Sequence, residues 1–235
     1  MIGTLNGLIA ATVVFVGGHF LLSSTPLRGQ LVRRLGTQGF RGLYSVAALA
    51  AFVWMLFAYR DAPPLAVWQP PPAFSWIPLV AMPLAALLMV CGLTTRSPTM
   101  VGGEEASSGA PASFDPAPGI LRITRHPFLW AVVLWSLSHL LVNGDAASMI
   151  LMGGLLVLAA GGMGHIDQRR AAAMGSDWGP IVMTTSVVPF AALAAGRTSM
   201  DWAGIGWWRP LLALALFAAL LHLHAGIIGV SPLPQ

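Results

Sequence analysis

Charged side chains are scarce in this chain of 235 residues, because Asp, Glu, Lys and Arg together make up only 9% of it. An ordinary soluble domain carries about 25%. Lysine is absent, and a single cysteine, Cys91, excludes an internal disulfide and a thiolate metal cluster. These shortages exclude a soluble enzyme with a hydrated surface. Hydrophobic residues account for 56% of the chain, which also excludes a disordered protein and leaves an integral membrane protein.

Six apolar segments are long enough, or nearly so, to cross a bilayer as helices, which takes about 20 residues. They are Ile2–Leu22, Gly42–Tyr59, Phe74–Leu93, Pro127–Val142, Ala146–Gly164 and Pro210–Val230. A short amphipathic helix at the membrane surface is predicted for Thr25–Leu35. The expected fold class is therefore all-α: one polytopic membrane helix bundle over residues 1–235, with about six transmembrane helices and one interfacial helix.

Two connecting segments differ from short turns. Thr94–Thr124 is rich in Gly, Ser and Pro and is predicted to be a flexible linker. Asp177–Gly196 is mildly apolar and is predicted to be an interfacial or re-entrant piece rather than a seventh span. Small residues in the fifth span are predicted to let neighbouring helices approach closely. They are Gly153, Gly154, Gly161, Gly162 and Gly164.

The arginines predict the orientation of the chain. With six spans, the first, third and fifth connections lie on one side, and they contain every arginine except Arg60. Positive charge stays on the cytoplasmic side, so both termini are predicted to be periplasmic. A composition rich in Ala, Gly and Arg without a plastid transit peptide favours a bacterial inner (cytoplasmic) membrane. Because the arginines lie between apolar segments, the pI of 10.6 does not indicate a nucleic-acid partner.

Six histidines lie in or at the ends of the predicted spans. Ionisable groups in a membrane are costly and usually mark a site, and neutral imidazole is a common ligand of haem iron. Depth along the spans sorts them into two layers, each of which could ligate one haem. The layer near the cytoplasmic ends contains His19, His126 and His165, and the opposite layer contains His139 with His222 or His224. Each ring could instead form an ordinary hydrogen bond between helices.

The run Thr124-Arg125-His126-Pro127 opens the fourth span. Its free N–H groups and Arg125 could hold an anion such as a haem propionate or a phosphate, or could form a plain capping turn. Asp167, Arg169 and Arg170 are predicted to form an ion-paired anchor at the interface. All eight acidic residues are expected in loops, which argues against a proton-driven transporter.

Several motifs resemble those of the NnrU family over nearly the whole chain. They are Gly18-His19-Phe20 and the segments 39–44, 119–127, 135–139, 165–170, 185–190 and 224–234. The resemblance implies a haem b in the membrane, with His19 and His139 as the iron ligands. The family includes the 15-cis-zeta-carotene isomerase of plants and cyanobacteria, and bacterial members linked to denitrification.

Two functions follow from this resemblance. The first is cis–trans isomerisation of a carotenoid polyene through reversible electron donation from ferrous haem, in an apolar pocket lined by Phe128, Trp130 and Trp135. The second is a non-enzymatic haem protein that supports nitrite and nitric oxide reduction as a sensor, electron carrier or assembly factor. The isomerases have a cysteine at the position of Ser136, and this departure favours the second function. A membrane methyltransferase is a weaker third reading, because some such enzymes use an Arg-His-Pro opening.

Depth and resemblance indicate different pairs of iron ligands. His19 and His139 are each about four residues from opposite ends of a ~30 Å core, and so lie about 18 Å apart along the membrane normal. Two ligands of a single iron lie far closer together. The sequence therefore leaves two other pairings open: His224 with His139, and His126 or His165 with His19.

Overall fold

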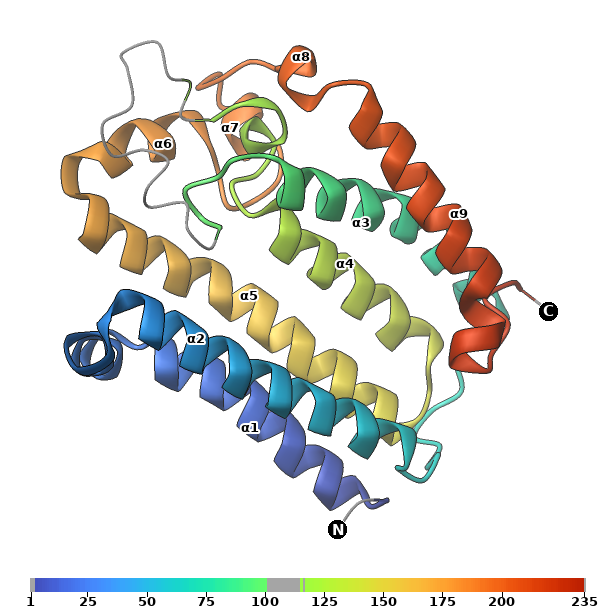
Figure 1. Cartoon of the computed structure of the whole chain (residues 1–235). Coiled ribbons are helices and arrows are strands. Elements are labelled where there is room, and N and C mark those ends of the chain that lie inside the picture. Colours follow the sequence, from blue (N-terminus) through green and yellow to red (C-terminus); the bar gives the residue numbers. More distant parts are fainter. Residues whose placement is uncertain (1–2, 101–114, 116, 235) are drawn as a thin grey trace. The chain divides into compact units, whose positions relative to one another are not determined.

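The computed structural model describes residues 3–100, 115 and 117–234 (Figure 1). Within these residues all regular structure is helical, apart from one isolated β-bridge between Ala66 and Asp145. The elements are α1 (Leu5–Ser23), α2 (Thr25–Arg60), η1 (Pro72–Ser75), α3 (Trp76–Thr94), η2 (Gly119–Arg122), α4 (Pro127–Val142), α5 (Ala146–Met174), η3 (Gly175–Asp177), α6 (Trp178–Thr184), α7 (Ala191–Ala194), α8 (Trp202–Ile205) and α9 (Trp208–Ile228). The all-α fold class is confirmed.

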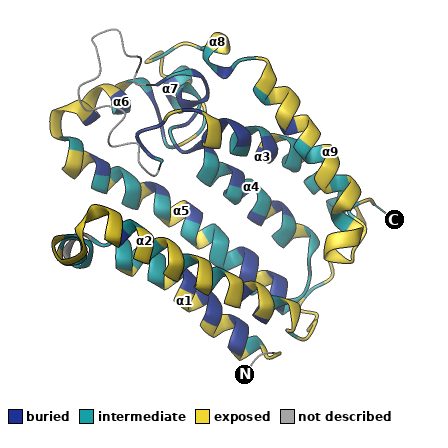
Figure 2. Ribbon diagram, viewed as in Figure 1, coloured by how far each residue is buried: buried dark blue, intermediate teal, exposed yellow. Residues whose placement is uncertain are grey.

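In the described part of the chain, five helical stretches are long and apolar enough to cross a membrane. They are Leu5–Ser23, Leu27–Arg60, Pro72–Thr94, Ala146–Thr184 and Trp208–Ile228, and α4 is a shorter apolar helix. Together they coincide with the six predicted spans. Many of their apolar side chains are exposed, as the yellow segments of α2 and α9 in Figure 2 show. Such surfaces are stable against lipid rather than water, so the chain is a multi-pass membrane helix bundle.

Helix α2 contains a break at Gly36, whose φ of 70° and ψ of 166° are not helical. Only glycine adopts this conformation readily, because it has no Cβ. The break separates Thr25–Leu35 from the apolar stretch that follows, and so coincides with the end of the predicted amphipathic helix. Its position at a membrane surface stays a prediction.

The chain divides into two compact units. Unit 1 comprises Met1–Phe74 and Ser136–Leu158, and unit 2 comprises Ser75–Trp135 and Ala159–Gln235. Helices α4 and α5 each contribute one part to unit 1 and another to unit 2. The prediction of a single domain stays a prediction.

In unit 1, α1 packs against α2 and buries Leu8, Ala11 and Phe15. The α5 part of the unit reaches α1 at Gly154, where an added Cβ would collide with Cγ2 of Thr12. An added Cβ at Gly153 or Gly164 would meet nothing within 4 Å. The predicted close approach through small residues is therefore confirmed at Gly154 and wrong at Gly153 and Gly164.

In unit 2, helices α3 and α9 pack against each other through Ala86, Val90 and Ala213. The short elements η2, α6, α7 and α8 lie at one end of this unit, where α3 ends and α4 and α9 begin (Figure 1). We call the described residues 95–100, 115, 117–126 and 175–207 the cap of unit 2. The segment 177–196 contains the end of η3 together with α6 and α7, and it forms no spanning helix of its own, which confirms that part of the prediction. Its interfacial or re-entrant position stays a prediction.

The cap has a small core of its own. Ala117, Ile120 and Leu121 are buried together with Cys91 and Ile205. Gly119, with a φ of +58°, lies so close to Gly204 that an added Cβ would be 2.6 Å from its carbonyl carbon. The prediction of a flexible linker over Thr94–Thr124 is therefore wrong for its described ends, which are packed. Residues 101–114 and 116 of that segment lie outside the described part of the chain.

Candidate functional site

The main polar cluster of unit 2 joins Arg125 and His126, just before α4, to Asp167 in α5. One Asp167 oxygen accepts hydrogen bonds from Arg125 Nε at 2.8 Å and Nη2 at 2.6 Å. The other lies 2.8 Å from His126 Nε2. The side chains of Arg125, His126 and Asp167 are 11%, 1% and 16% exposed. We call this group the Asp167 cluster.

The residues before α4 are held in place by backbone and hydroxyl groups of the cap. Thr124 donates its hydroxyl to Val187 O at 2.9 Å. The backbone of Arg125 donates to Ser186 O at 3.0 Å and accepts from the Thr99 hydroxyl at 2.7 Å. Its guanidinium also lies 6.0 Å from the centre of the Trp178 ring, within reach of a cation–π contact. These contacts fix the direction in which Arg125 and His126 point.

This arrangement changes the role predicted for Arg125. Its guanidinium binds the carboxylate of Asp167 rather than lying open to an external anion. The first turn of α4 is also covered, since a Cβ at Gly92 would lie 2.7 Å from the Phe128 nitrogen. A capping turn closed by an ion pair describes this segment better than an open anion site.

Asp167 itself departs from two expectations. It lies within α5 rather than in a loop, so the prediction that all acidic residues are in loops is wrong. Its charged partner is Arg125 rather than Arg169 or Arg170. Arg170 is 1% exposed and donates from Nη2 to Met100 O at 2.7 Å. An acid inside an apolar helix is a recognised sign of a partner elsewhere in the chain, but sequence spacing does not identify that partner.

His19 lies in unit 1 on α1, between two aromatic rings. Its ring centre is 4.5 Å from that of Phe15 and 5.5 Å from that of Tyr44. Its Nδ1 is 2.7 Å from Phe15 O and donates to it, since a carbonyl can only accept. That bond assigns the tautomer in which Nε2 is the acceptor. Within the described residues Nε2 has no hydrogen-bond partner.

His139 belongs to the part of α4 in unit 1, the unit that also contains His19. Its Nδ1 is 3.3 Å from the Ser138 hydroxyl. One turn earlier, Ser136 is fully buried, and its Oγ has no hydrogen-bond partner in the described residues. The sequence identifies Ser136 as a departure from the isomerases but does not predict its burial.

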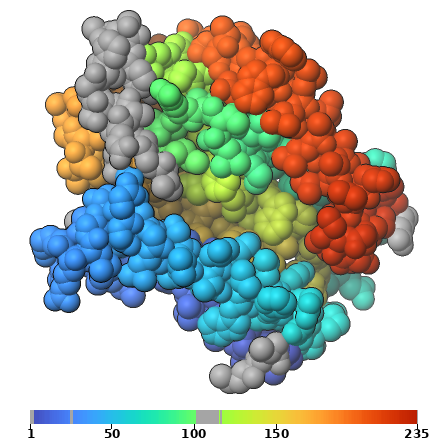
Figure 3. All heavy atoms as spheres, in the orientation of Figure 1, coloured from blue at the N-terminus to red at the C-terminus, as the bar shows by residue number. Residues whose placement is uncertain are grey.

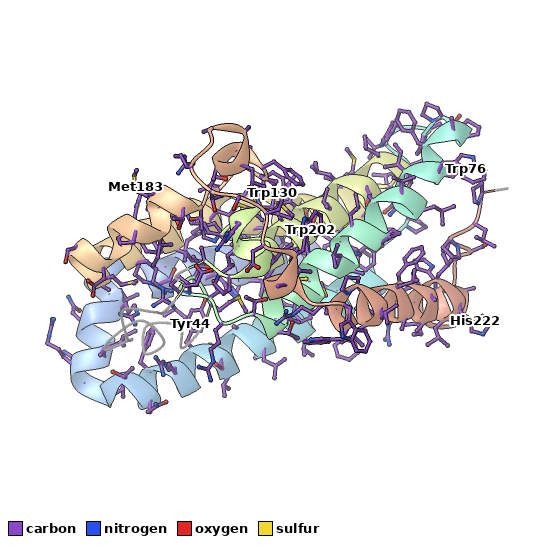
Figure 4. The ribbon with its side chains drawn as sticks, turned by 90° about the horizontal axis from the view of Figure 1, so that it is seen from above. Tyr44, Trp76, Trp130, Met183, Trp202 and His222 are labelled. Carbon is purple, nitrogen blue, oxygen red and sulfur yellow. The ribbon has the colours of Figure 1, made fainter. Side chains whose placement is uncertain are left out.

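The remaining histidines belong to unit 2. His126 contacts the Asp167 carboxylate through its Nε2, and His165 is half-buried on α5. His224 donates from Nδ1 to Val230 O at 2.8 Å, while His222 is exposed near the end of α9 (Figure 4). Among the described residues, no group of three or more His, Cys, Asp or Glu side chains could hold a metal ion. Of the predicted site residues, the structure therefore brings His126 and Arg125 to a common partner, and that partner is the carboxylate of Asp167.

Fold and site together define a helical multi-pass membrane protein with buried histidine and arginine side chains. A profile of the family described as NnrU protein matches residues 7–232, so the chain belongs to the NnrU family. This confirms the resemblance found in the motifs.

Two curated relatives share part of the sequence. The chain is 39% identical to the chloroplastic 15-cis-zeta-carotene isomerase of Arabidopsis thaliana over 117 residues. This aligned region covers 50% of this chain and 31% of the relative. It is 35% identical to the protein of the same name from Zea mays over 82 residues, a region that covers 35% of this chain and 22% of that relative. The matched region is thus less than a third of either relative. No solved structure matches this chain significantly.

Proposed function

We propose that this protein binds haem b in the membrane and isomerises a cis double bond in an apolar polyene of the zeta-carotene type. The observation that carries the proposal is the His19 ring. Its Nδ1–H is held by Phe15 O, and its Nε2 is left without a partner in the described residues. An imidazole oriented in this way through one nitrogen is suited to bind a metal through the other.

Buried hydroxyls in unit 1 support the fit to such a group. Thr12 lies about two turns before His19 on the same face of α1, and Ser136 lies about one turn before His139 on α4. Thr12 is 7% exposed and Ser136 0% exposed, and neither hydroxyl has a hydrogen-bond partner in the described residues. A buried hydroxyl without a partner is costly. A cofactor or substrate from outside the chain would offer such groups new contacts.

The chain's own residues would bind and orient the reactants. His19 would hold the haem together with a second histidine, which is His139 if the resemblance holds and His126 or His165 if depth along the spans decides. When bound, the ferrous haem would supply reversible electron donation, which lowers the order of a double bond. The Phe15 and Tyr44 rings fix the plane of His19. Apolar helices exclude water and suit a substrate that dissolves only in lipid. The indole N–H of Trp130 donates to Val187 O at 2.8 Å, which leaves the faces of its ring available to an apolar substrate.

An absorption spectrum of the purified protein in detergent tests the haem proposal. We expect a Soret band that is lost or shifted in His19→Ala and His139→Ala and retained in His222→Ala, whose side chain is exposed. Loss of the band in His224→Ala, His126→Ala or His165→Ala instead would select one of the other pairs. A protein that takes up no haem when haem is supplied would overturn the proposal.

The enzyme activity needs a separate test. Reduced, haem-loaded protein is incubated with 15-cis-zeta-carotene in detergent, and the isomers are separated by chromatography. We expect conversion without net oxidation, and we expect His19→Ala to abolish it.

Ser136 favours a second function, a non-enzymatic haem protein that supports nitrite and nitric oxide reduction. A serine hydroxyl is a poor iron ligand compared with a thiolate. Haem binding without isomerisation, together with a spectral response to nitric oxide, would select this function.

A further inference from the structure

We propose that one exposed surface of the cap lies in the phospholipid headgroup layer and anchors unit 2 there. This surface comprises Trp202, Trp207, Trp208, Arg197 and Arg209, and we call it the aromatic–arginine surface. It includes α8 and the start of α9, which form the orange-red surface in Figure 3. The inference goes beyond the proposed function and does not depend on it.

The three tryptophans are unusually exposed. Trp202 is 72% exposed, Trp207 78% and Trp208 41%. Their indole N–H groups make no hydrogen bond within the described residues, whereas that of Trp130 is bound to a carbonyl. Bulk water would expose the apolar rings to solvent, and hydrocarbon would leave the N–H groups without a hydrogen-bond acceptor. The headgroup layer accommodates both parts of the side chain, which is why tryptophan is enriched there.

Contacts to the ends of two spans place this surface at the edge of the apolar region. Trp207 immediately precedes α9. Arg209 donates to the hydroxyl and the carbonyl of Thr94, the last residue of α3, at 2.8 and 3.2 Å. It also donates to Gly204 O and Ile205 O at 2.8 and 2.6 Å. The start of one span and the end of another are thus tied to α8 at the same level.

Charge selects phospholipid headgroups as the occupant. Arg197 donates to the carbonyls of Val182, Met183 and Thr185, and Arg209 donates only to hydroxyl and carbonyl oxygens. Within the described residues neither guanidinium pairs with a carboxylate, so no negative charge of the protein balances either of them. The nearby Asp201 carboxylate accepts instead from the backbone N–H groups of Gly119 and Gly204. Phosphate groups of the bilayer complement these two cations.

Spin labels attached to single cysteines test the depth of this surface. Trp202→Cys and Trp207→Cys are labelled in the full chain and reconstituted into phosphatidylcholine and phosphatidylglycerol vesicles. Collision rates with oxygen and with a water-soluble nickel complex are then compared with those of spin-labelled lipids. Cys91 is fully buried, and it is replaced by Ser if the unaltered chain takes up label. Leu214→Cys, which is 59% exposed within α9, is the matched control for the hydrocarbon region.

We expect both tryptophan positions to report the headgroup level, and Leu214 to lie deeper by about 10 Å along the helix. Met183→Cys, at a 63% exposed position on α6 of the cap (Figure 4), should also report the headgroup level; it replaces either variant that fails to fold. Labels that collide with nickel as freely as in water, or that lie as deep as Leu214, would overturn the proposal. Dipolar broadening between labels on two molecules would also overturn it, because a second copy would then cover the surface.

Discussion

Asp167 is the residue on which the polar interior of unit 2 depends. Its carboxylate neutralises Arg125 and occupies His126, both of which lie almost fully inside the protein. A buried ion pair adds little net stability, but removal of one partner leaves an uncompensated charge. Loss of Asp167 should therefore cost much more than loss of a carboxylate at the surface.

Asp167→Asn is expected to lower the free energy of unfolding by about 3 kcal/mol, the lower end of the range for breaking a buried pair, since the pair retains some solvent access. The matched control is Asp61→Asn, because Arg60 and Asp61 form a pair with 71% and 33% exposed side chains. That change should cost less than about 1 kcal/mol. Unfolding in detergent, followed by tryptophan fluorescence, measures both. Equal losses in the two variants would contradict this role for Asp167.

Asp201 supplies a pH dependence at the surface of the cap. The backbone N–H groups of Gly204 and Gly119 hold the pKa of its carboxyl below the ordinary value. A carboxyl group whose pKa is lowered by folding stabilises the fold at pH values above its ordinary pKa of about 4. This stabilisation is lost as the pH falls through the lowered pKa. We expect the thermal midpoint of the wild type to exceed that of Asp201→Asn at neutral pH, and the gap to narrow below about pH 4. A gap that stays constant down to about pH 3 would exclude this effect.

The residue-level contacts were the hardest to predict from the sequence. The Thr124–Pro127 run indicates a helix start, because proline is favoured in the first turn, and α4 does begin at Pro127. That Arg125 binds Asp167 is not encoded in local spacing, because the two residues lie 42 positions apart. The Nε2 of His19, which has no partner among the residues that the structure describes, likewise depends on a side-chain orientation that the sequence pattern does not specify.

Among the helices, α1 and α5 approach each other closely at Gly154. Gly154 leaves just enough space for the methyl group of Thr12, while its neighbour Gly153 faces open space. The two adjacent glycines therefore provide a matched pair within one helix.

Gly154→Ala is expected to destabilise the protein by about 1–3 kcal/mol through overpacking. Gly153→Ala should be neutral or slightly stabilising, because alanine favours the helix by about 1 kcal/mol. Thermal unfolding in detergent compares the two variants. Adding Thr12→Ala to Gly154→Ala should restore stability, because it removes the Thr12 methyl group with which the new Cβ collides. A Gly153→Ala variant as unstable as Gly154→Ala would show that packing against Thr12 is not the cause.

Hydrophobic run length predicted the helices well, because bilayer thickness limits the length of an apolar span. It underestimated α5, which continues past the predicted end at Gly164 to Met174. The reason is physical: a helix keeps its backbone hydrogen bonds past the end of an apolar run, and Asp167 is accommodated there by its contacts with Arg125 and His126. Composition also misjudged the ends of Thr94–Thr124, because its glycine allows close packing as readily as flexibility.

For the whole molecule, the distribution of arginine leads to a proposal for its orientation. Every arginine except Arg60 lies in the connections assigned to one side, and we propose that this side is cytoplasmic and that both termini are periplasmic. The cap of unit 2, with its arginines, would then face the cytoplasm.

Reporter fusions expressed in a bacterium test this orientation. Alkaline phosphatase fused after Gln235 should be active, and green fluorescent protein at the same place should be dark. A fluorescent protein fused after Ser176, within the fifth connection, should be bright. The reverse pattern in both places would refute the orientation.

The Asp167 cluster also has a consequence for biosynthesis. Arg125 leaves the ribosome 42 residues before Asp167, which corresponds to about 2–8 seconds at common synthesis rates of about 5–20 residues per second. During that interval the carboxylate that Arg125 pairs with in the folded protein has not yet been made, and the aqueous edge of the membrane is the favourable place for the guanidinium. We therefore expect the start of α4 to stay at that edge until Asp167 of α5 has been made.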